Sequence, residues 1–401
     1  MDFSPCGFLP VMPRTETGQI SESQAEAQVL PASEGWGFHA PPGQTELLFL
    51  TALSAAVMWI TALLLHHTSN LILNYGDNSA YLAVAKAIRA WDFHQLNIQH
   101  FMGYPYLIAL VSILLHIPPL AALWLISAGS ALVSVLFVGR LFGGWVAGYF
   151  AFTNLAWMQL SFIGGSEPLA MALGFGALLA FRKNRTSGAA LLASLAVTVR
   201  PLMVFILLGI GLVLLRRKKF GSFLVALNTA LAIAGAYMLP LALYFGDPLL
   251  TVRSYATRDY GGGGIVGPHG HLFGWPFHGI VAGTLAYPAP WTSLLLSFFW
   301  IGLVLLAVGM MCYKNFRAYA RKHANEAIFC GMYLLALFCY DYLIWARSNF
   351  SRFSIPVLPF VFLALLPLLP KDRRIFWLLS VVTAVLAMFS AVGIRNVFGG
   401  G

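Results

Sequence analysis

Apolar stretches alternate with short polar segments along the sequence from about residue 46 to residue 395. Many of these stretches approach the ~20 residues that a helix needs to cross a hydrocarbon layer ~30 Å thick. Because lipid cannot satisfy open backbone groups, helices are the expected spanning elements. The pattern predicts an all-α polytopic membrane protein with about eleven transmembrane helices. The predicted spans are 46–66, 103–117, 119–138, 144–162, 167–181, 187–214, 222–245, 290–312, 326–345, 353–370 and 375–395.

The composition agrees with this fold class. Hydrophobic residues make up 59% of the 401 residues and charged residues only 9%, which is far more apolar than a typical soluble domain. The net charge is +10, but the basic residues lie in short runs between apolar stretches, so no nucleic-acid partner is expected. None of the four cysteines forms a CxxC pair, so neither a disulfide framework nor a zinc site is indicated.

The first 45 residues differ in composition from the rest of the chain. Segment 1–45 is polar and is predicted to be a disordered tail. It lacks a basic stretch ahead of an apolar core, so a signal peptide is not expected. The transmembrane domain is predicted to occupy 46–398.

Basic residues cluster in short segments between spans, and cytoplasmic loops carry such an excess. The three strongest segments are 216–219, 314–322 and 371–374. If all three face the cytoplasm, three other segments face outwards and meet on one side of the membrane. These predicted outer loops are 67–102, 247–289 and 346–353.

A fourth basic segment conflicts with simple alternation. Segment 182–185 is expected in the cytoplasm, yet strict alternation of eleven spans puts it outside and puts Glu167 inside. The span at 103–117 is short, and 187–214 is long enough for two short helices. The crossing parity of 103–200 is therefore left open.

The first outer loop is predicted to contain a short amphipathic helix over 79–91. Apolar side chains recur there at helical spacing, whereas Lys86 and Arg89 lie away from them. A helix of this kind lies in the membrane interface and does not cross. The second outer loop is long and contains Gly261–Gly264, a run with great backbone freedom.

Asp77 lies two residues before the start of the predicted helix. One interpretation is a helix N-cap, since Asp accepts hydrogen bonds from free amides there. The other is a general base at the membrane surface, held in place by the same helix start. The two roles are compatible, and local sequence leaves both open.

Two further charges lie inside or beside apolar stretches. Glu167 lies between Ser166 and Pro168, which fits the start of a helix. Arg200 precedes Pro201, which fits a side chain that snorkels from the end of a short helix. Because an unpaired charge in the membrane costs about 2.5–3.5 kcal/mol on insertion scales, an ion pair between Glu167 and Arg200 is the alternative.

Arg347 and Arg352 flank a short segment between two spans on the predicted outer face. Positive charge there runs against the orientation rule. Guanidinium groups suit a lipid phosphate or diphosphate. Binding of ordinary phospholipid headgroups is the alternative.

His269 and His271 form an H-x-H pair in the second outer loop, which also contains Arg258. The pair could ligate zinc, but no third ligand follows at a recognised spacing, so hydrogen bonding to a substrate is favoured. No cofactor is expected; a divalent metal is compatible with the sequence but not indicated. No Walker loop, GxSxG or HExxH motif supports a nucleotide-driven or serine-hydrolase function.

Several short motifs occur in a fixed order over about residues 46–360. They are Asp77 with Tyr81, Gly103-Tyr104-Pro105, Ser166-Glu167-Pro168, Thr198-Val199-Arg200-Pro201, and Arg352 with Pro356 and Pro359. In this order they resemble the C-type glycosyltransferases (GT-C), membrane enzymes that use lipid-phosphate sugars. The likeness is greatest to the group of the second mannosyltransferase of glycosylphosphatidylinositol assembly, and the wider group includes the protein O-mannosyltransferases.

The resemblance implies transmembrane helices around a cavity at the exterior membrane surface. It also implies that an acid of the first outer loop, here Asp77, is the catalytic base. Many relatives carry two adjacent acids where this chain has Asp77-Asn78, which puts metal use in doubt. The oligosaccharyltransferase branch carries a large soluble outer domain, and no polar stretch of that size is present here.

The expected function is that of an inverting glycosyltransferase. It would move a sugar, mannose by resemblance, from a polyprenyl- or dolichyl-phosphate donor to a hydroxyl of a lipid or glycan acceptor. The expected site residues are Asp77 and Glu167 for catalysis, Arg200, Arg347 and Arg352 for the donor phosphate, and Tyr81, Arg258, His269 and His271 for the substrate loop.

Two other function classes fit the same sequence. A transporter or flippase of lipid-linked sugars needs broken helices deep in the membrane, for which 187–214 is the candidate. A non-catalytic membrane scaffold needs none of the charged residues above. A multi-pass protein of the bacterial inner membrane is favoured over one of the endoplasmic reticulum.

Overall fold

The computed structural model describes residues 41–64, 75–93, 100–256, 273–286, 291–341 and 349–398. Every regular element in these ranges is a helix, apart from an isolated bridge between Phe273 and Tyr340. The predicted all-α fold class is therefore confirmed for the described part of the chain. Most of the predicted tail, residues 1–40, lies outside it.

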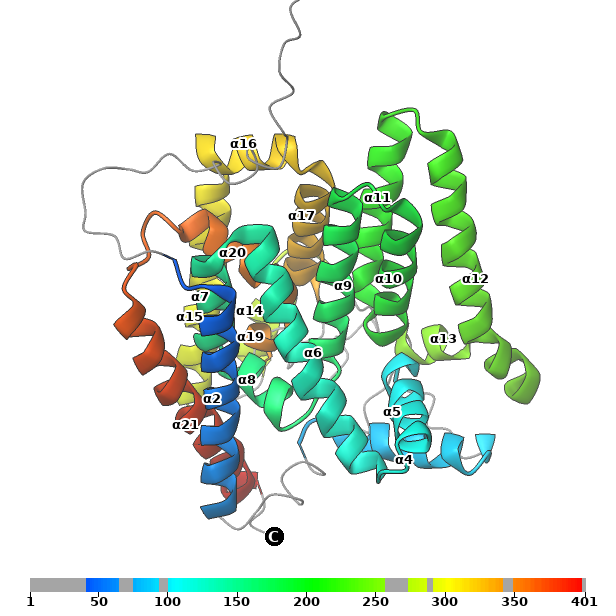
Figure 1. The fold of residues 1–401 in the computed structure, drawn as a ribbon, viewed down its shortest axis with the longest axis horizontal. Helices are drawn as coiled ribbons and strands as arrows, with labels where there is room; N and C mark the ends of the chain where they lie inside the picture. Colours follow the sequence, from blue (N-terminus) through cyan, green and yellow to red (C-terminus); the bar gives the residue numbers. More distant parts are fainter. Residues whose placement is uncertain are drawn as a thin grey trace, which may run out of the picture. The chain divides into compact units, whose positions relative to one another are not determined.

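Figure 1 shows the helices, which follow one another in this order. The first half of the chain contains α2 (Gln44–Leu64), α4 (Asn78–Arg89), α5 (Gly103–Leu114), α6 (Pro119–Phe142), α7 (Gly144–Phe152), α8 (Leu155–Phe162), α9 (Glu167–Arg182), α10 (Thr186–Val199) and η2 (Pro201–Met203). The second half contains α11 (Val204–Arg216), α12 (Phe220–Phe245), α13 (Leu250–Ala256), α14 (His278–Ala286), α15 (Trp291–Met311), α16 (Lys314–Lys322), α17 (Ala324–Cys339), α19 (Phe350–Phe353), η3 (Ile355–Val357), α20 (Leu358–Leu365) and α21 (Arg373–Phe398).

Five helices of the described ranges are long and apolar enough to cross a membrane, or six if the bent pair α8 and α9 counts as one span. The prediction of about eleven transmembrane helices is not confirmed. Three of the predicted spans, 144–162, 187–214 and 353–370, break into shorter helices. The helices found at three others, 103–117, 167–181 and 326–345, have only 12, 16 and 16 residues. An apolar run in a sequence does not reveal where its helix breaks.

The surface of α12 indicates the solvent that surrounds these helices. Only Ala226 and Leu241 are buried among its 26 residues, while Leu224, Leu231 and Leu243 are exposed. An apolar face that runs the length of a helix is too large to leave in water. Lipid is the solvent that fits this face, which is consistent with a polytopic membrane protein.

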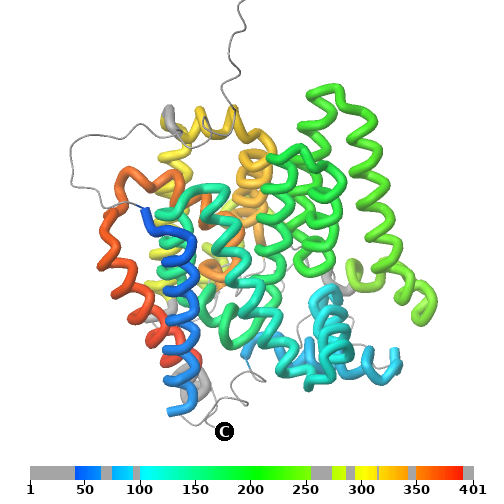
Figure 2. Tube along the Cα trace, viewed as in Figure 1, coloured from blue at the N-terminus to red at the C-terminus, as the bar shows by residue number. Residues whose placement is uncertain are grey.

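The two ends of α9 resolve the open crossing parity. Arg182 at its last residue binds Glu326 of α17, close to the basic helix α16. Glu167 at its first residue binds Arg352 of α19. Figures 1 and 2 show α16 at one end of the helices and α4 at the other. The basic segment 182–185 therefore lies at the end assigned to the cytoplasm.

The amphipathic helix predicted over 79–91 is observed as α4. Its buried side includes Tyr81, Val84 and Ala85, whereas Lys86 is exposed. The short apolar stretch that follows forms α5, which has only 12 residues and is too short to cross a bilayer as a straight helix. The span predicted at 103–117 is therefore not confirmed.

Gly103 allows α5 to approach the end of α10. A Cβ atom on Gly103 would lie 2.3 Å from Thr198 Oγ1 and 2.7 Å from the Thr198 carbonyl oxygen. Two of the short motifs singled out in the sequence thus meet at a backbone contact that only glycine permits.

The change Gly103→Ala should lower the thermal stability of the purified protein. The added methyl group forces the backbone at Thr198 to move, and overpacking of this kind costs about 1–3 kcal/mol. Gly129→Ala in α6 is the matched control, because no atom lies within 4 Å of the added Cβ there. Melting of both variants in detergent measures the effect; equal melting temperatures would contradict the contact.

Candidate active site

Asp77 lies in the turn that leads into α4. Gly76 adopts a positive φ of 52°, and the Asp77 carbonyl accepts a hydrogen bond from Tyr81 N at 3.0 Å. The Asp77 side chain makes no capping hydrogen bond. The N-cap interpretation therefore holds for its backbone position but not for its carboxylate.

The Asp77 carboxylate faces two basic side chains from other parts of the chain. Arg352 Nη2 donates to Asp77 Oδ2 at 3.2 Å, and His100 Nε2 lies 3.4 Å from Asp77 Oδ1. The Asp77 side chain is 30% exposed, so a molecule entering from outside can reach it.

Glu167 begins α9 after a sharp bend. The axes of α8 and α9 differ by 101°, and Gly164 adopts a φ of 130° within the bend. A side chain at Gly164 would collide with Leu123 and Asn78, so the turn depends on this glycine. It places the Glu167 carboxylate, with only 6% of the side chain exposed, among charged groups.

One oxygen of Glu167 binds two guanidinium groups. Both Arg200 Nη2 and Arg352 Nε donate to Glu167 Oε1. The pairing of Glu167 with Arg200, the alternative at the sequence level, is thus observed. The other oxygen, Oε2, is buried without a hydrogen-bond partner.

Arg200 occupies the break between α10 and η2. Its backbone is extended, with φ −141° and ψ 114°, and Pro201 starts the next helical turn. Arg200 Nε donates to Ser166 Oγ at 3.0 Å, and Ser166 Oγ also lies 3.2 Å from the Tyr81 hydroxyl. The break therefore directs the Arg200 side chain towards the interior of the protein. This differs from a side chain that snorkels to the membrane surface.

Arg352 is held by the short helix α19. Asn154 starts α8 by accepting from Trp157 N at 3.0 Å and also donates from Nδ2 to the Ser351 carbonyl at 3.1 Å. On the other side, the Tyr333 hydroxyl donates to the Phe353 carbonyl at 3.1 Å. Both neighbours of Arg352 are therefore fixed by side chains from distant helices.

Asp77, Arg352, Glu167 and Arg200 form a chain of contacts in which acids and arginines alternate, so their charges balance. Burial raises the pKa of the Asp77 carboxyl, but the hydrogen bond from His100 and the charges of Arg352 and Arg200 outweigh it, so this pKa lies well below its usual range. Burial raises the pKa of Tyr81 to about 12. In the absence of substrate, Asp77 is therefore a carboxylate held by cations and Tyr81 a neutral hydroxyl.

The structure thus brings together five of the predicted site residues. They are Asp77, Tyr81, Glu167, Arg200 and Arg352. The other four candidates lie outside the described residues, so their roles stay predictions. They are Arg258, His269, His271 and Arg347.

His100 is the member of this cluster that sequence analysis missed. Its ring also packs edge-on against Tyr81, with centroids 5.5 Å apart. Its position in the first outer loop, three residues before Gly103, is the only signal that the sequence offers. A histidine in a loop carries no pattern that distinguishes it from others.

A second contact fixes the end of the second outer loop. His278, the first residue of α14, places Nδ1 2.5 Å from Asp341 Oδ1. Gly274 N donates to the Cys339 carbonyl at 2.8 Å, and a Cβ on Gly274 would lie 2.7 Å from Asp341 Oδ2. The last part of this loop is thus attached to the end of α17.

No group of three or more His, Cys, Asp or Glu side chains in the described ranges is arranged to hold a metal ion. Within the cluster, the Arg352 guanidinium lies between the two carboxylates. The prediction on metal use remains untested.

No protein-family model and no curated protein matches this sequence significantly. Among solved structures, the chain is similar to the apo form of the Archaeoglobus fulgidus oligosaccharyltransferase, with 13% sequence identity and a TM-score of 0.42. The match covers 84% of this chain and 56% of that protein, so this chain spans little more than half its length. At this level of similarity, inferences about function rest on the residues of the cluster.

Glu167→Ala should destabilise the protein strongly. Loss of one partner of a buried ion pair leaves the remaining charge uncompensated and typically costs about 3–5 kcal/mol. Asp247→Asn is a suitable control, because its partner Arg253 is 68% exposed and such surface pairs contribute about 0–1 kcal/mol. The free energies of unfolding in detergent would compare the two changes; a Glu167→Ala variant no less stable than the control would contradict the shared pairing.

Proposed function

We propose that this protein is a membrane glycosyltransferase that uses Asp77 as its catalytic base. One observation carries the proposal most: the carboxylate in the first outer loop is paired with a guanidinium from the far end of the chain, at 3.2 Å. The order of motifs that resembles the C-type glycosyltransferases places an acid and an arginine in these two positions. The proposed class is inverting transfer from a lipid-phosphate sugar.

The difference in exposure supports different proposed roles for the two carboxylates. Asp77 is 30% exposed and Glu167 only 6%. A general base must come within hydrogen-bond reach of the proton that it removes, and only Asp77 is open enough for an acceptor hydroxyl. Glu167 instead positions Arg200 and Arg352, so it supports the reaction without touching the substrate.

Arg352 is proposed to exchange partners when the donor binds. Its guanidinium is shared between Glu167 and Asp77, and a donor phosphate is a stronger bidentate partner than a single carboxylate oxygen at 3.2 Å. When Arg352 turns to the phosphate, Asp77 loses the cation that weakens it as a base. Donor binding would thereby activate the base.

The reaction then follows from these positions. The acceptor oxygen attacks the anomeric carbon of the sugar while Asp77 takes its proton, and the bond between that carbon and the phosphate oxygen breaks. The electron pair leaves with the lipid phosphate, whose charge Arg352 stabilises. Because a phosphate leaving group needs no proton, one base is sufficient.

The remaining details rest on the resemblance. The donor is proposed to be a polyprenyl- or dolichyl-phosphate sugar, with mannose favoured, and the acceptor a hydroxyl on a lipid or glycan. Arg347 would join Arg352 at the phosphate, and the loop containing Arg258, His269 and His271 would cover the acceptor.

Asp77→Asn should reduce the rate of sugar transfer by at least about 10²–10³, because the amide cannot take the proton of the acceptor hydroxyl. Arg352→Ala should reduce the same rate by about 10²–10³ through loss of a charge-stabilising donor. Asp92→Asn is the control, because it removes an acid of the same outer loop at the far end of α4. Transfer from radiolabelled polyprenyl-phosphate mannose in membranes measures the rates.

Three results, from the transfer assay and two companion experiments, separate the function classes. Full transfer by Asp77→Asn would remove the proposed base. Movement of the labelled lipid across liposomes by the unchanged protein, without a new glycosidic bond, would indicate a transporter. Growth support by Asp77→Asn and Arg352→Ala variants in complementation would indicate a scaffold.

The pH dependence tests the exchange of partners. In the free protein the pKa of Asp77 is well below its usual range, so the deprotonated base persists as pH falls and kcat/KM declines only in strong acid. Donor binding draws Arg352 away and brings negative charge, which raises this pKa. We therefore expect kcat to decline at a higher pH than kcat/KM.

His100→Gln is a useful companion variant. It weakens the contact that lowers the pKa of Asp77 in the free protein, so the acid limb of kcat/KM should move to higher pH. If kcat and kcat/KM of the unchanged protein declined at the same acidic pH, this result would contradict the exchange of partners.

A further inference from the structure

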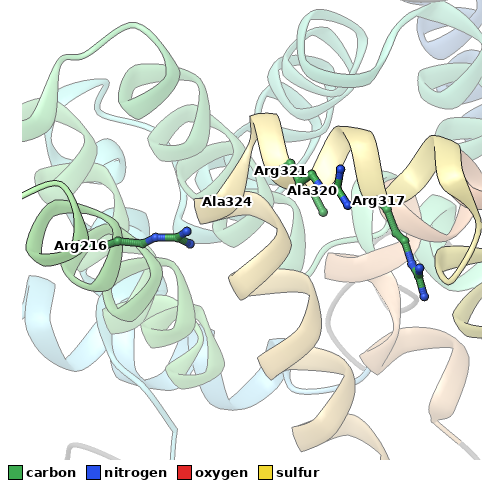
Figure 3. Close-up of a pocket in the computed structure, with 5 residues that line it drawn as sticks. All are labelled: Arg216, Arg317, Ala320, Arg321 and Ala324. Carbon is green, nitrogen blue, oxygen red and sulfur yellow. The ribbon is translucent and has the colours of Figure 1, made fainter.

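A pocket opens at the end of the helices opposite to Asp77. It has a volume of about 560 Å³ and lies where the end of α11 meets α16. Figure 3 shows its lining residues, which are Arg216, Arg317, Ala320, Arg321 and Ala324. The lining of this pocket thus includes three arginines from two helices.

These arginines differ from those of the candidate active site in their partners. Arg200 and Arg352 bind carboxylates, whereas no ion pair is found for the three pocket arginines within the described ranges. The nearest acid of α17, Glu326, is already bound by Arg182 through two contacts of 3.0 and 2.7 Å. The pocket therefore has a positive charge that the described chain does not balance.

The helix that carries two of these arginines is held rigidly on its other side. Phe316 and Tyr319 pack against the hydrophobic core, and the Tyr319 hydroxyl donates to Glu326. Arg317 and Arg321 lie one turn apart on the exposed side. α16 is thus an amphipathic helix whose apolar side is anchored and whose basic side lines the pocket.

The surroundings of the pocket decide which anion fits. The exposed apolar surface of α12 indicates a lipid environment around these helices, and basic amphipathic helices lie in the membrane interface. A basic pocket between helices at the cytoplasmic side is a recognised setting for anionic lipid headgroups. A volume of about 560 Å³ is within the range of ordinary ligand sites.

We propose that Arg216, Arg317 and Arg321 form a binding site for the phosphate of an anionic phospholipid headgroup, on the membrane face opposite to Asp77. The arginines supply charge-assisted hydrogen bonds to phosphate oxygens, and the lipid chains extend into the bilayer beside the helices. This site is separate from the proposed donor site, since its residues come from α11, α16 and the start of α17.

To test this site, dioctanoyl phosphatidylglycerol is added in increasing amounts to the full chain in a neutral detergent. Binding is measured as the shift in melting temperature. The unchanged protein should show a saturable rise. The triple variant R216Q/R317Q/R321Q should bind about 100-fold more weakly, because each basic residue near an anionic lipid contributes about 1 kcal/mol and 1.4 kcal/mol corresponds to tenfold.

The matched control is R217Q/K218Q/K219Q. It removes the same charge from residues directly beside Arg216 that do not line the pocket, and it should bind the lipid within about twofold of the unchanged protein. An equal loss of affinity in this control would overturn the site, since the effect would then come from the charge of the whole face.

Two further titrations of the unchanged protein do not depend on the folding of any variant. Dioctanoyl phosphatidylcholine should bind at least about tenfold more weakly than phosphatidylglycerol, since its choline group opposes the arginines. Inorganic phosphate should give no comparable shift at the same concentration. Equal affinity for the two lipids, or an equal shift with inorganic phosphate, would overturn the assignment to an anionic lipid.

Discussion

The shared carboxylate oxygen of Glu167 is the contact on which the arrangement of the outer end depends. It binds Arg200 and Arg352, which are 152 residues apart in the chain, while its side chain is almost fully buried. Charged groups cost several kcal/mol to remove from water, so each must find its partner at the same place. The break after α10, the bend before α9 and the short helix α19 must therefore all meet at one point.

Glycine and proline explain why the helices break at these points. Gly164 permits the bend, Pro168 lies in the first turn of α9, and Pro201 follows Arg200 directly. Pro356 likewise lies in the first turn after α19. A proline lacks an amide hydrogen and favours the first turn of a helix, where amides have no partner within the helix. A new helix can therefore start at these prolines without the loss of many hydrogen bonds. Each break delivers a charged or polar side chain into the cluster.

The sequence predicted the local features of this site better than its global arrangement. Short motifs predicted the helix start at Asp77 and the amphipathic side of α4. They also predicted that Glu167 and Arg200 lie at helix ends beside a proline. The pairing of Asp77 with Arg352 could be expected only from topology and resemblance, because no local pattern relates residues so far apart. His100 was missed because a single histidine in a loop carries no pattern that distinguishes it from others. The number of spans is not confirmed, because hydropathy averages over a break in a helix. The conflict at 182–185 arises when α5, with only 12 residues, is counted as a crossing.

The two ends of the helices use the same residue types in opposite ways. In the cluster of Asp77, Glu167, Arg200 and Arg352, two arginines balance two carboxylates, and Asp77 is the more exposed of the two acids. In the proposed mechanism, an arriving phosphate replaces a carboxylate as a partner of Arg352, which releases the accessible acid Asp77. At the other end, Arg182 and Glu326 are bound to each other, while Arg216, Arg317 and Arg321 line an open pocket. An anion there displaces no partner. Under the two proposals, donor binding at the outer end would change the partners of Asp77, whereas lipid binding at the inner end would leave the ion pair of Arg182 and Glu326 in place.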